Sequence, residues 1–123
     1  MVTADDVRRI ALTLPGAFEK QAWGMPTFRA GQGGRVFASL SDDDQVIGVK
    51  CPKEDRAELI AAEPEKFCLR EGHDDAWAWM RVRLGALEDE EELRAILTDS
   101  WRQAAPRRLL AEHPDLGLPH ADD

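Results

Sequence analysis

The sequence has no excess of basic residues and no long apolar segment, and each absence narrows the range of functions. It contains 16 Lys and Arg against 24 Asp and Glu, for a formal net charge of −8. That balance argues against non-specific nucleic-acid binding over the whole surface, so any DNA contact would need a local basic patch. The longest apolar runs fall far short of the ~20 residues of a membrane-spanning helix. Residues 1–6 have neither the basic nor the apolar region of a secretion signal, which favours the cytoplasm.

The residues that build catalytic and metal centres are also scarce. Cys51 and Cys68 are the only cysteines. Their spacing leaves a disulfide open, but in the cytoplasm we expect reduced thiols. With His73 they form one loose cluster that lacks a zinc spacing and a fourth ligand, so no metal or cofactor is expected. Neither GxSxG nor HExxH occurs, so we assign no catalytic residue and expect a protein that is not an enzyme.

The chain length fits one domain. We assign residues 1–123 to a single domain, because 123 residues show no internal repeat and no linker. A chain of this size buries roughly two-thirds of its unfolded surface, so it needs no metal or disulfide to fold. Residues 113–123 are expected to form a frayed tail.

Helical and alternating apolar patterns succeed each other along the chain. Thr3 with Asp6 predicts a helix start, and Leu14-Pro15-Gly16 predicts the end of that helix. Phe18 and Trp23 are expected to pack, with a short strand around Trp23. Helices are predicted over residues 3–14, 53–63 and about 88–105, with another turn at 107–112. Strands are predicted over 26–30, 35–40, 45–50, 67–69 and 76–84.

The order of these elements predicts the fold class. Short turns such as Gly31–Gly34 join the first predicted strands, so the sheet should be antiparallel. Helices precede, interrupt and follow the strands, and each has one apolar face. We therefore predict an α+β two-layer sandwich, with a sheet of about five strands and helices on one face.

The strand over residues 76–84 is the one around which the predicted sheet is organised. Side chains alternate between the two faces of a strand. One face carries Met80, Val82 and Leu84, which are ordinary core residues. The opposite face carries Trp77, Trp79, Arg81 and Arg83. We expect helices to cover the apolar face and the Trp/Arg face to stay at least partly open.

This Trp/Arg face is the best candidate for a binding site. Indoles stack on flat ligands, and arginines grip phosphate or carboxylate with two hydrogen bonds. Basic residues on neighbouring strands would extend the patch, and Arg35 follows the glycine-rich turn at a hairpin tip. The candidate residues are Trp79, Arg81, Arg83, Arg29, Arg35 and Lys50. In the alternative interpretation the tryptophans pack under a loop or the tail, and the arginines pair with Asp74 and Asp75.

Several segments, taken in order, resemble the MmcQ/YjbR family of small bacterial proteins. They are residues 8–16, Pro26-Thr27-Phe28-Arg29, residues 34–40, Ala61-Ala62-Glu63-Pro64, residues 79–84 and residues 100–109. The resemblance covers residues 3 to 111 and implies a frataxin-like (CyaY-like) fold and a DNA-binding protein of the double-wing type. Many members have a His-Trp pair where this chain has Ala78-Trp79, so no catalytic role is carried over.

Residues and resemblance together indicate a small non-enzymatic protein that binds DNA through the Trp/Arg face and the hairpin tips. Because the protein is acidic overall, we expect DNA binding to be weak and confined to a local basic patch. The alternatives are a frataxin-like metal-handling protein, or a domain that binds another protein or a small anionic or aromatic ligand with the same face. The acidic run at 88–92 is better explained as the chemistry of a helix start. We expect no membrane partner, and a monomer or weak dimer.

Overall fold

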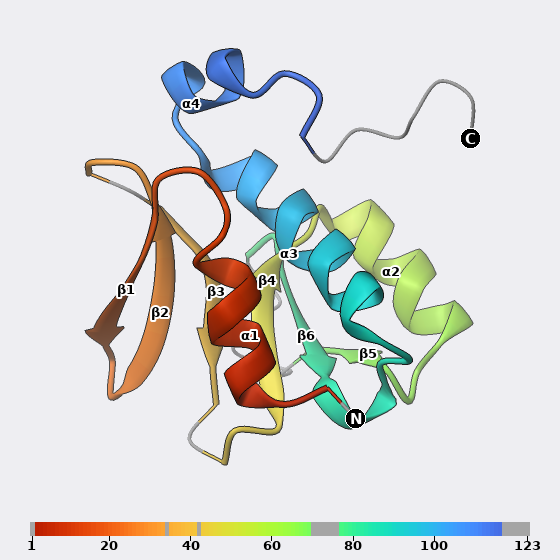
Figure 1. Cartoon of the computed structure of the whole chain (residues 1–123). Coiled ribbons are helices and arrows are strands. Elements are labelled where there is room, and N and C mark those ends of the chain that lie inside the picture. The colour runs from red at the N-terminus through yellow and green to blue at the C-terminus, as the bar shows by residue number, and fades with distance from the viewer. Residues whose placement is uncertain (1, 34, 42, 70–76, 117–123) are drawn as a thin grey trace.

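The computed structural model describes residues 2–33, 35–41, 43–69 and 77–116. The turn predicted at 72–75, with His73, Asp74 and Asp75, lies outside the described residues, and so does His120. Figure 1 shows the arrangement of the elements. In chain order they are α1 (Ala4–Ala11), β1 (Ala17–Ala22), β2 (Met25–Ala30), β3 (Arg35–Leu40), β4 (Val46–Lys50), α2 (Lys53–Ala62), β5 (Phe67–Cys68), β6 (Trp79–Arg83), a 3₁₀ turn (Leu84–Ala86), α3 (Glu90–Ala104) and α4 (Arg107–Glu112).

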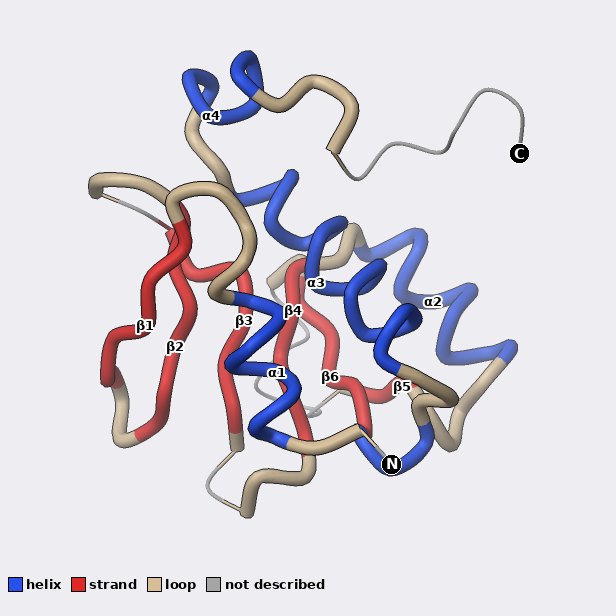
Figure 2. Tube along the Cα trace, in the orientation of Figure 1, coloured by secondary structure: helices blue, strands red, loops and turns tan. Residues whose placement is uncertain are grey.

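The strands form one antiparallel sheet in the order β1-β2-β3-β4-β6-β5. Strand β6 therefore lies inside the sheet, between β4 and β5, rather than at an edge. Helices α1 and α3 lie across one face of the sheet, and α2 lies beside α3 near β5 and β6 (Figures 1 and 2). This arrangement confirms the predicted α+β two-layer sandwich, with six strands where about five were expected.

Strand register separates the two faces of the sheet. Phe28, Ala38, Val49 and Met80 are paired in one row across β2, β3, β4 and β6, and all are buried beneath the helices. In the neighbouring row, one residue away along each strand, the side chains face the other way. That row is Thr27, Ser39, Gly48 and Arg81. We call the side bearing this second row the outer face, and no helix in the described part of the chain covers it.

The core lies between the sheet and helix α3. Val82 faces the core from β6 and is fully buried, as are Leu93, Leu97 and Trp101 of α3. The register between β2 and β3 shifts at Phe28, where β3 has one extra residue. This bulge turns two consecutive side chains of β3 toward the helices, and both are fully buried. They are Phe37 and Ala38.

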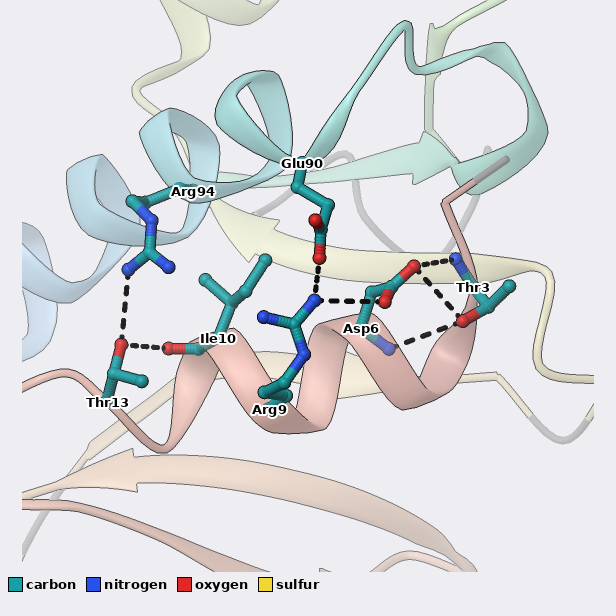
Figure 3. A network of polar contacts seen from close by, with 7 residues as sticks. All are labelled: Thr3, Asp6, Arg9, Ile10, Thr13, Glu90 and Arg94. Atoms are coloured by element: carbon teal, nitrogen blue, oxygen red, sulfur yellow. Dashed lines mark hydrogen bonds and ion pairs between the residues drawn. The ribbon is translucent and has the colours of Figure 1, made fainter.

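Helix α1 begins as the sequence predicts. The side chain of Thr3 accepts a hydrogen bond from the Asp6 N–H at 3.3 Å, and the Thr3 N–H donates to the Asp6 carboxylate at 2.9 Å (Figure 3). This reciprocal capping box is the predicted one. The bond from the Thr3 N–H holds the pKa of Asp6 below its ordinary value. The helix ends at Ala11, earlier than the predicted residue 14, and the hydroxyl of Thr13 donates to the Ile10 carbonyl at 2.6 Å.

Polar side chains connect α1 to α3 above the core. Arg9 forms an ion pair with Glu90, at the start of α3. Near the other end of α1, Arg94 donates a hydrogen bond to the Thr13 hydroxyl at 3.3 Å. Figure 3 shows both contacts, one joining α3 to α1 and the other joining α3 to the turn that follows α1. The cations of this layer are thus paired locally, on the side of the molecule away from the outer face.

The segment before β2 corrects the sequence prediction. The expected short strand around Trp23 is a turn, and the strand precedes it as β1, at the edge of the sheet. Trp23 and Gly24 both have positive φ, 54° and 76°, between the paired residues Ala22 and Met25. That is the pattern of a two-residue type I′ hairpin. Phe18 and Trp23 do not pack as expected, since 40% and 76% of their surfaces are exposed.

The C-terminal segments divide where the predicted ranges 88–105 and 107–112 meet. The side chain of Asp89 accepts from the Glu92 N–H and starts α3. Pro106 separates α3 from α4, so residues 107–112 form a separate helix rather than a last turn of α3. Arg102 donates to the Leu116 carbonyl at 3.1 Å, which ties residue 116 to α3. Residues 117–123 of the predicted tail lie outside the described residues.

Of the helices that the structure describes, none combines the length and the apolar character needed to cross a membrane.

Candidate functional site

Charge is distributed unevenly between strands and helices. The six strands contain six basic residues but a single acid, Glu19. Glu19 pairs with Phe28 of the helix-side row, and its carboxylate binds Arg8 of α1 at 3.3 Å. The strand positions of the outer face therefore carry cations and no acid. The cations there are Lys20, Arg29, Lys50, Arg81 and Arg83. In a chain of net charge −8, the strand positions of this face are locally basic.

Trp79 has a fixed position on the outer face because β4 has a glycine beside it. A Cβ atom on Gly48 would lie 2.5 Å from Nε1 of the Trp79 indole, so the ring rests directly on the glycine backbone. Lys50 is paired opposite Trp79, and Arg81 is paired opposite Gly48. The indole is half-buried. The ring packs against Gly48, and the residue remains partly exposed.

Arg56 of α2 holds the start of β6, a role that sequence reasoning missed. Its side chain is buried, and Nη1 donates to the carbonyls of Trp77 and Trp79 at 2.9 and 2.8 Å. The Cys51 N–H adds a bond to the Ala78 carbonyl at 3.0 Å. A signal was present, because Arg56 stands three and four residues before the apolar Leu59–Ile60 pair and so shares their helix face.

The two arginines of β6 are engaged with the protein. Nη1 of Arg83 donates to the carbonyls of Pro64 and Glu65 at 2.9 and 3.2 Å, while much of the side chain stays exposed. Arg81 is half-buried and also has an interaction partner. Trp77, just before β6, is 67% exposed and does not pack as the alternative interpretation expected.

Arg29 is on the outer face but is not beside Trp79. Strands β3 and β4 separate β2 from β6, which places these two residues about 14 Å apart at ~4.8 Å per strand spacing. Arg29 instead reaches back along its own strand. Nε lies 3.4 Å from the Thr27 hydroxyl, and the guanidinium carbon lies 5.9 Å from the centre of the Trp23 ring. The outer face thus has two Trp/cation groups, one at Trp79 and one at Trp23.

Arg35 lies at a different place, beside the turn between β2 and β3. It lines a hollow of about 460 Å³ between that turn and the junction of α3 with α4. The polar side chains of the hollow are Gln32, Arg35, Gln103 and Arg107. The structure therefore brings Trp79, Lys50 and Arg81 together, places Arg83 next along the same strand, and leaves Arg29 and Arg35 apart from them.

The ion pairs of the described residues lie on the helix side or near α2. They join Arg8 to Glu19, Arg9 to Asp6 and Glu90, and Lys66 to Glu63 and Glu92. Lys20 and Lys50 of the outer face form no ion pair with any described acid. Their ammonium groups are thus available to an external anion without first breaking an internal pair.

The cysteines are free thiols. Burial, reinforced by the negative charges of Asp55 and Asp99, raises the pKa of Cys51 to about 11. A thiol that is protonated at neutral pH is a poor nucleophile and a poor metal ligand. Within the described ranges, no three His, Cys, Asp or Glu side chains gather into a group that could hold a metal ion.

Comparisons with known proteins agree with this architecture. A family model described as YjbR matches residues 12–103. The crystal structure of the Deinococcus radiodurans protein DR2400, which carries the DUF419 domain, is similar with a TM-score of 0.70 and 25% sequence identity, over 97% of this chain and 91% of that one. None of the curated proteins matches the chain. Because the family model spans most of the chain, and the residues that carried the sequence resemblance lie largely within that span, this protein belongs to the YjbR family.

Proposed function

We propose that this protein is a non-enzymatic nucleic-acid-binding module that uses the outer face of its sheet. The observation that carries the proposal is the segregation of charge. The outer-face strand positions hold five cations and no acid, in a protein of net charge −8. A phosphate backbone binds such a local patch while the acidic remainder of the surface opposes wider contact.

The Trp79 group is expected to be the centre of this interface. Lys50 stands opposite Trp79 in the pairing of β4 with β6, and its ammonium has no described acid as a partner. Arg81 extends the group by one step along β6. An ammonium and a guanidinium beside a half-exposed indole suit a ligand that joins phosphate to flat rings.

A matched pair of charge reversals tests the proposal. Lys50→Glu places an acid on the outer face, whereas Lys53→Glu makes the same change at an exposed position of α2, three residues later. Lys50→Glu should weaken DNA binding at low salt roughly tenfold, because a repulsive contact replaces an attractive one. It should also reduce the slope of log affinity against log salt by about one unit. Salt-titrated fluorescence anisotropy with a labelled oligonucleotide measures both quantities.

Lys53→Glu is the control, because it changes the net charge by the same amount outside the outer face, and its loss of affinity should be clearly smaller than that of Lys50→Glu. Equal losses in the two variants would show that net charge, not the outer face, governs binding. Wild-type protein that binds no DNA at low salt would refute the proposal altogether. Lys50 and Lys53 are better positions for this test than Arg81 and Arg83, because reversing the charge of either arginine would also disturb contacts within the protein.

The other functions considered receive less support. Metal handling needs converging oxygen ligands, and the described residues supply no such group. A small anionic ligand could instead use the hollow between Arg35 and Arg107, which is away from the Trp79 group. The hollow has basic and amide groups on two sides, so it remains the second candidate for anion binding.

A further inference from the structure

Trp23 occupies a turn position that disfavours its own side chain. Its φ of 54° lies in the left-handed region, where Asn, Asp and Gly are the usual residues and a bulky side chain is strained. A type I′ hairpin turn normally has Asn or Asp at this position, followed by Gly. The indole is also 76% exposed, so little burial offsets the strain. Neither the backbone conformation nor burial favours a tryptophan here.

The surroundings of Trp23 are those of a stacking site. The Arg29 guanidinium lies 5.9 Å from the ring centre, and the Thr27 hydroxyl holds Arg29 in that direction. Phe18, paired opposite Arg29, is 40% exposed on the same face. Lys20 of the neighbouring strand adds a second cation. An exposed indole backed by an arginine binds flat aromatic rings, and the adjacent cations favour rings attached to phosphate.

We infer that the nucleic acid bound by the outer face is single-stranded, and that Trp23 stacks on one of its unpaired bases. This inference rests on the proposed function and specifies its ligand. In a duplex both faces of each base are already stacked, so an exposed indole gains a partner only where the bases are free. Arg29 and Lys20 then contact the phosphates beside the stacked base, while Lys50, Trp79 and Arg81 bind a neighbouring part of the same strand.

The decisive variant is Trp23→Asn, which removes the ring and suits the turn. We expect its melting temperature to rise by about 3–5 °C, because asparagine tolerates the left-handed backbone. Its affinity for a labelled oligothymidylate should fall roughly tenfold, as expected for the loss of one base stack. Its affinity for a duplex of equal length should stay the same. Fluorescence anisotropy at low salt and thermal unfolding measure these quantities.

Two control variants test whether the loss of single-strand affinity depends on the aromatic ring and on its position at residue 23. Trp23→Phe keeps an aromatic ring and should retain most of the single-strand affinity. Leu12→Asn makes a similar apolar-to-amide change at a residue 45% exposed beyond the end of α1, and should change neither affinity. Wild-type protein should bind the single strand at least several times more tightly than the duplex.

The outcomes separate this inference from the proposed function. A wild type that prefers the duplex, or a Trp23→Asn variant with unchanged single-strand affinity, overturns the inference, while the proposed function stands if Lys50→Glu still weakens binding. A lower melting temperature for Trp23→Asn also contradicts it, because the indole would then serve the fold. A wild type that binds neither nucleic acid overturns both.

Discussion

Val82→Asp is expected to abolish the folded state at 25 °C. Val82 is fully buried on the helix side of β6, between its paired residues Ile47 of β4 and Phe67 of β5. An aspartate there would be an unpaired buried charge, at a cost of several kcal/mol. The total stability of a domain is about 5–15 kcal/mol. Circular dichroism of the purified variant should show loss of the cooperative thermal transition.

The same substitution on the opposite face is the control. Val46 is half-buried at the start of β4 and is paired opposite Arg83. Val46→Asp should remain folded and lose about 1 kcal/mol, the cost of a poor strand former. If Val46→Asp unfolds the protein and Val82→Asp does not, then the assignment of the two faces is wrong.

Trp101→Ala should cost about 3–5 kcal/mol of unfolding free energy, the range for removing a large buried aromatic side chain. Trp101 of α3 is fully buried, and its indole N–H donates to the Pro15 carbonyl at 2.9 Å. That bond ties the loop before β1 to the main helix. Trp101→Ala should therefore destabilise the β1–β2 hairpin as well as the core. Urea unfolding followed by circular dichroism measures the free energy.

Trp101→Phe separates the volume of the ring from the hydrogen bond. The phenyl ring fills most of the space but leaves the Pro15 carbonyl without its donor, a loss of about 1–3 kcal/mol. Trp101→Phe should thus be clearly less destabilised than Trp101→Ala. Equal losses would mean that the hydrogen bond, rather than packing, carries the contribution of Trp101.

The layered fold was predictable because local patterns specify it directly. The alternation of apolar and polar residues over 79–83 placed Met80 and Val82 on the core side, and both are buried. The capping box at Thr3 and Asp6 and the helix boundary at Pro106 depend on residues three or fewer positions apart. Sequence patterns of this short range predict local structure well, because no distant contact favours a different local structure.

The hairpin at Trp23 was not predictable in the same way. Type I′ turns are recognised by Asn-Gly or Asp-Gly, and Trp-Gly lacks the first of these residues. Strand β1 also gives no clean alternation, since four of its six residues are exposed at the sheet edge. A residue that breaks a local rule is often found at a functional site, which is why Trp23 is proposed as a stacking residue.

The composition of the candidate site depends on strand order, which no local pattern reveals. Because β6 pairs with β4, Lys50 meets Trp79, whereas two strands, β3 and β4, separate Arg29 on β2 from Trp79. Gly48 was an available signal, since a glycine inside a strand often marks a close approach. The atom that approaches it belongs to Trp79, 31 residues later in the chain.

The indole N–H resonances test the central claim, that nucleic acid binds the outer face, most directly. The chain has four tryptophans, and Trp101 is buried on the helix side as an internal reference. Adding a short oligonucleotide at low salt should shift the Trp79 and Trp23 signals, assigned with Trp79→Phe and Trp23→Phe, and leave the Trp101 signal in place. Unchanged Trp79 and Trp23 signals under saturating oligonucleotide would contradict the outer face as the binding surface.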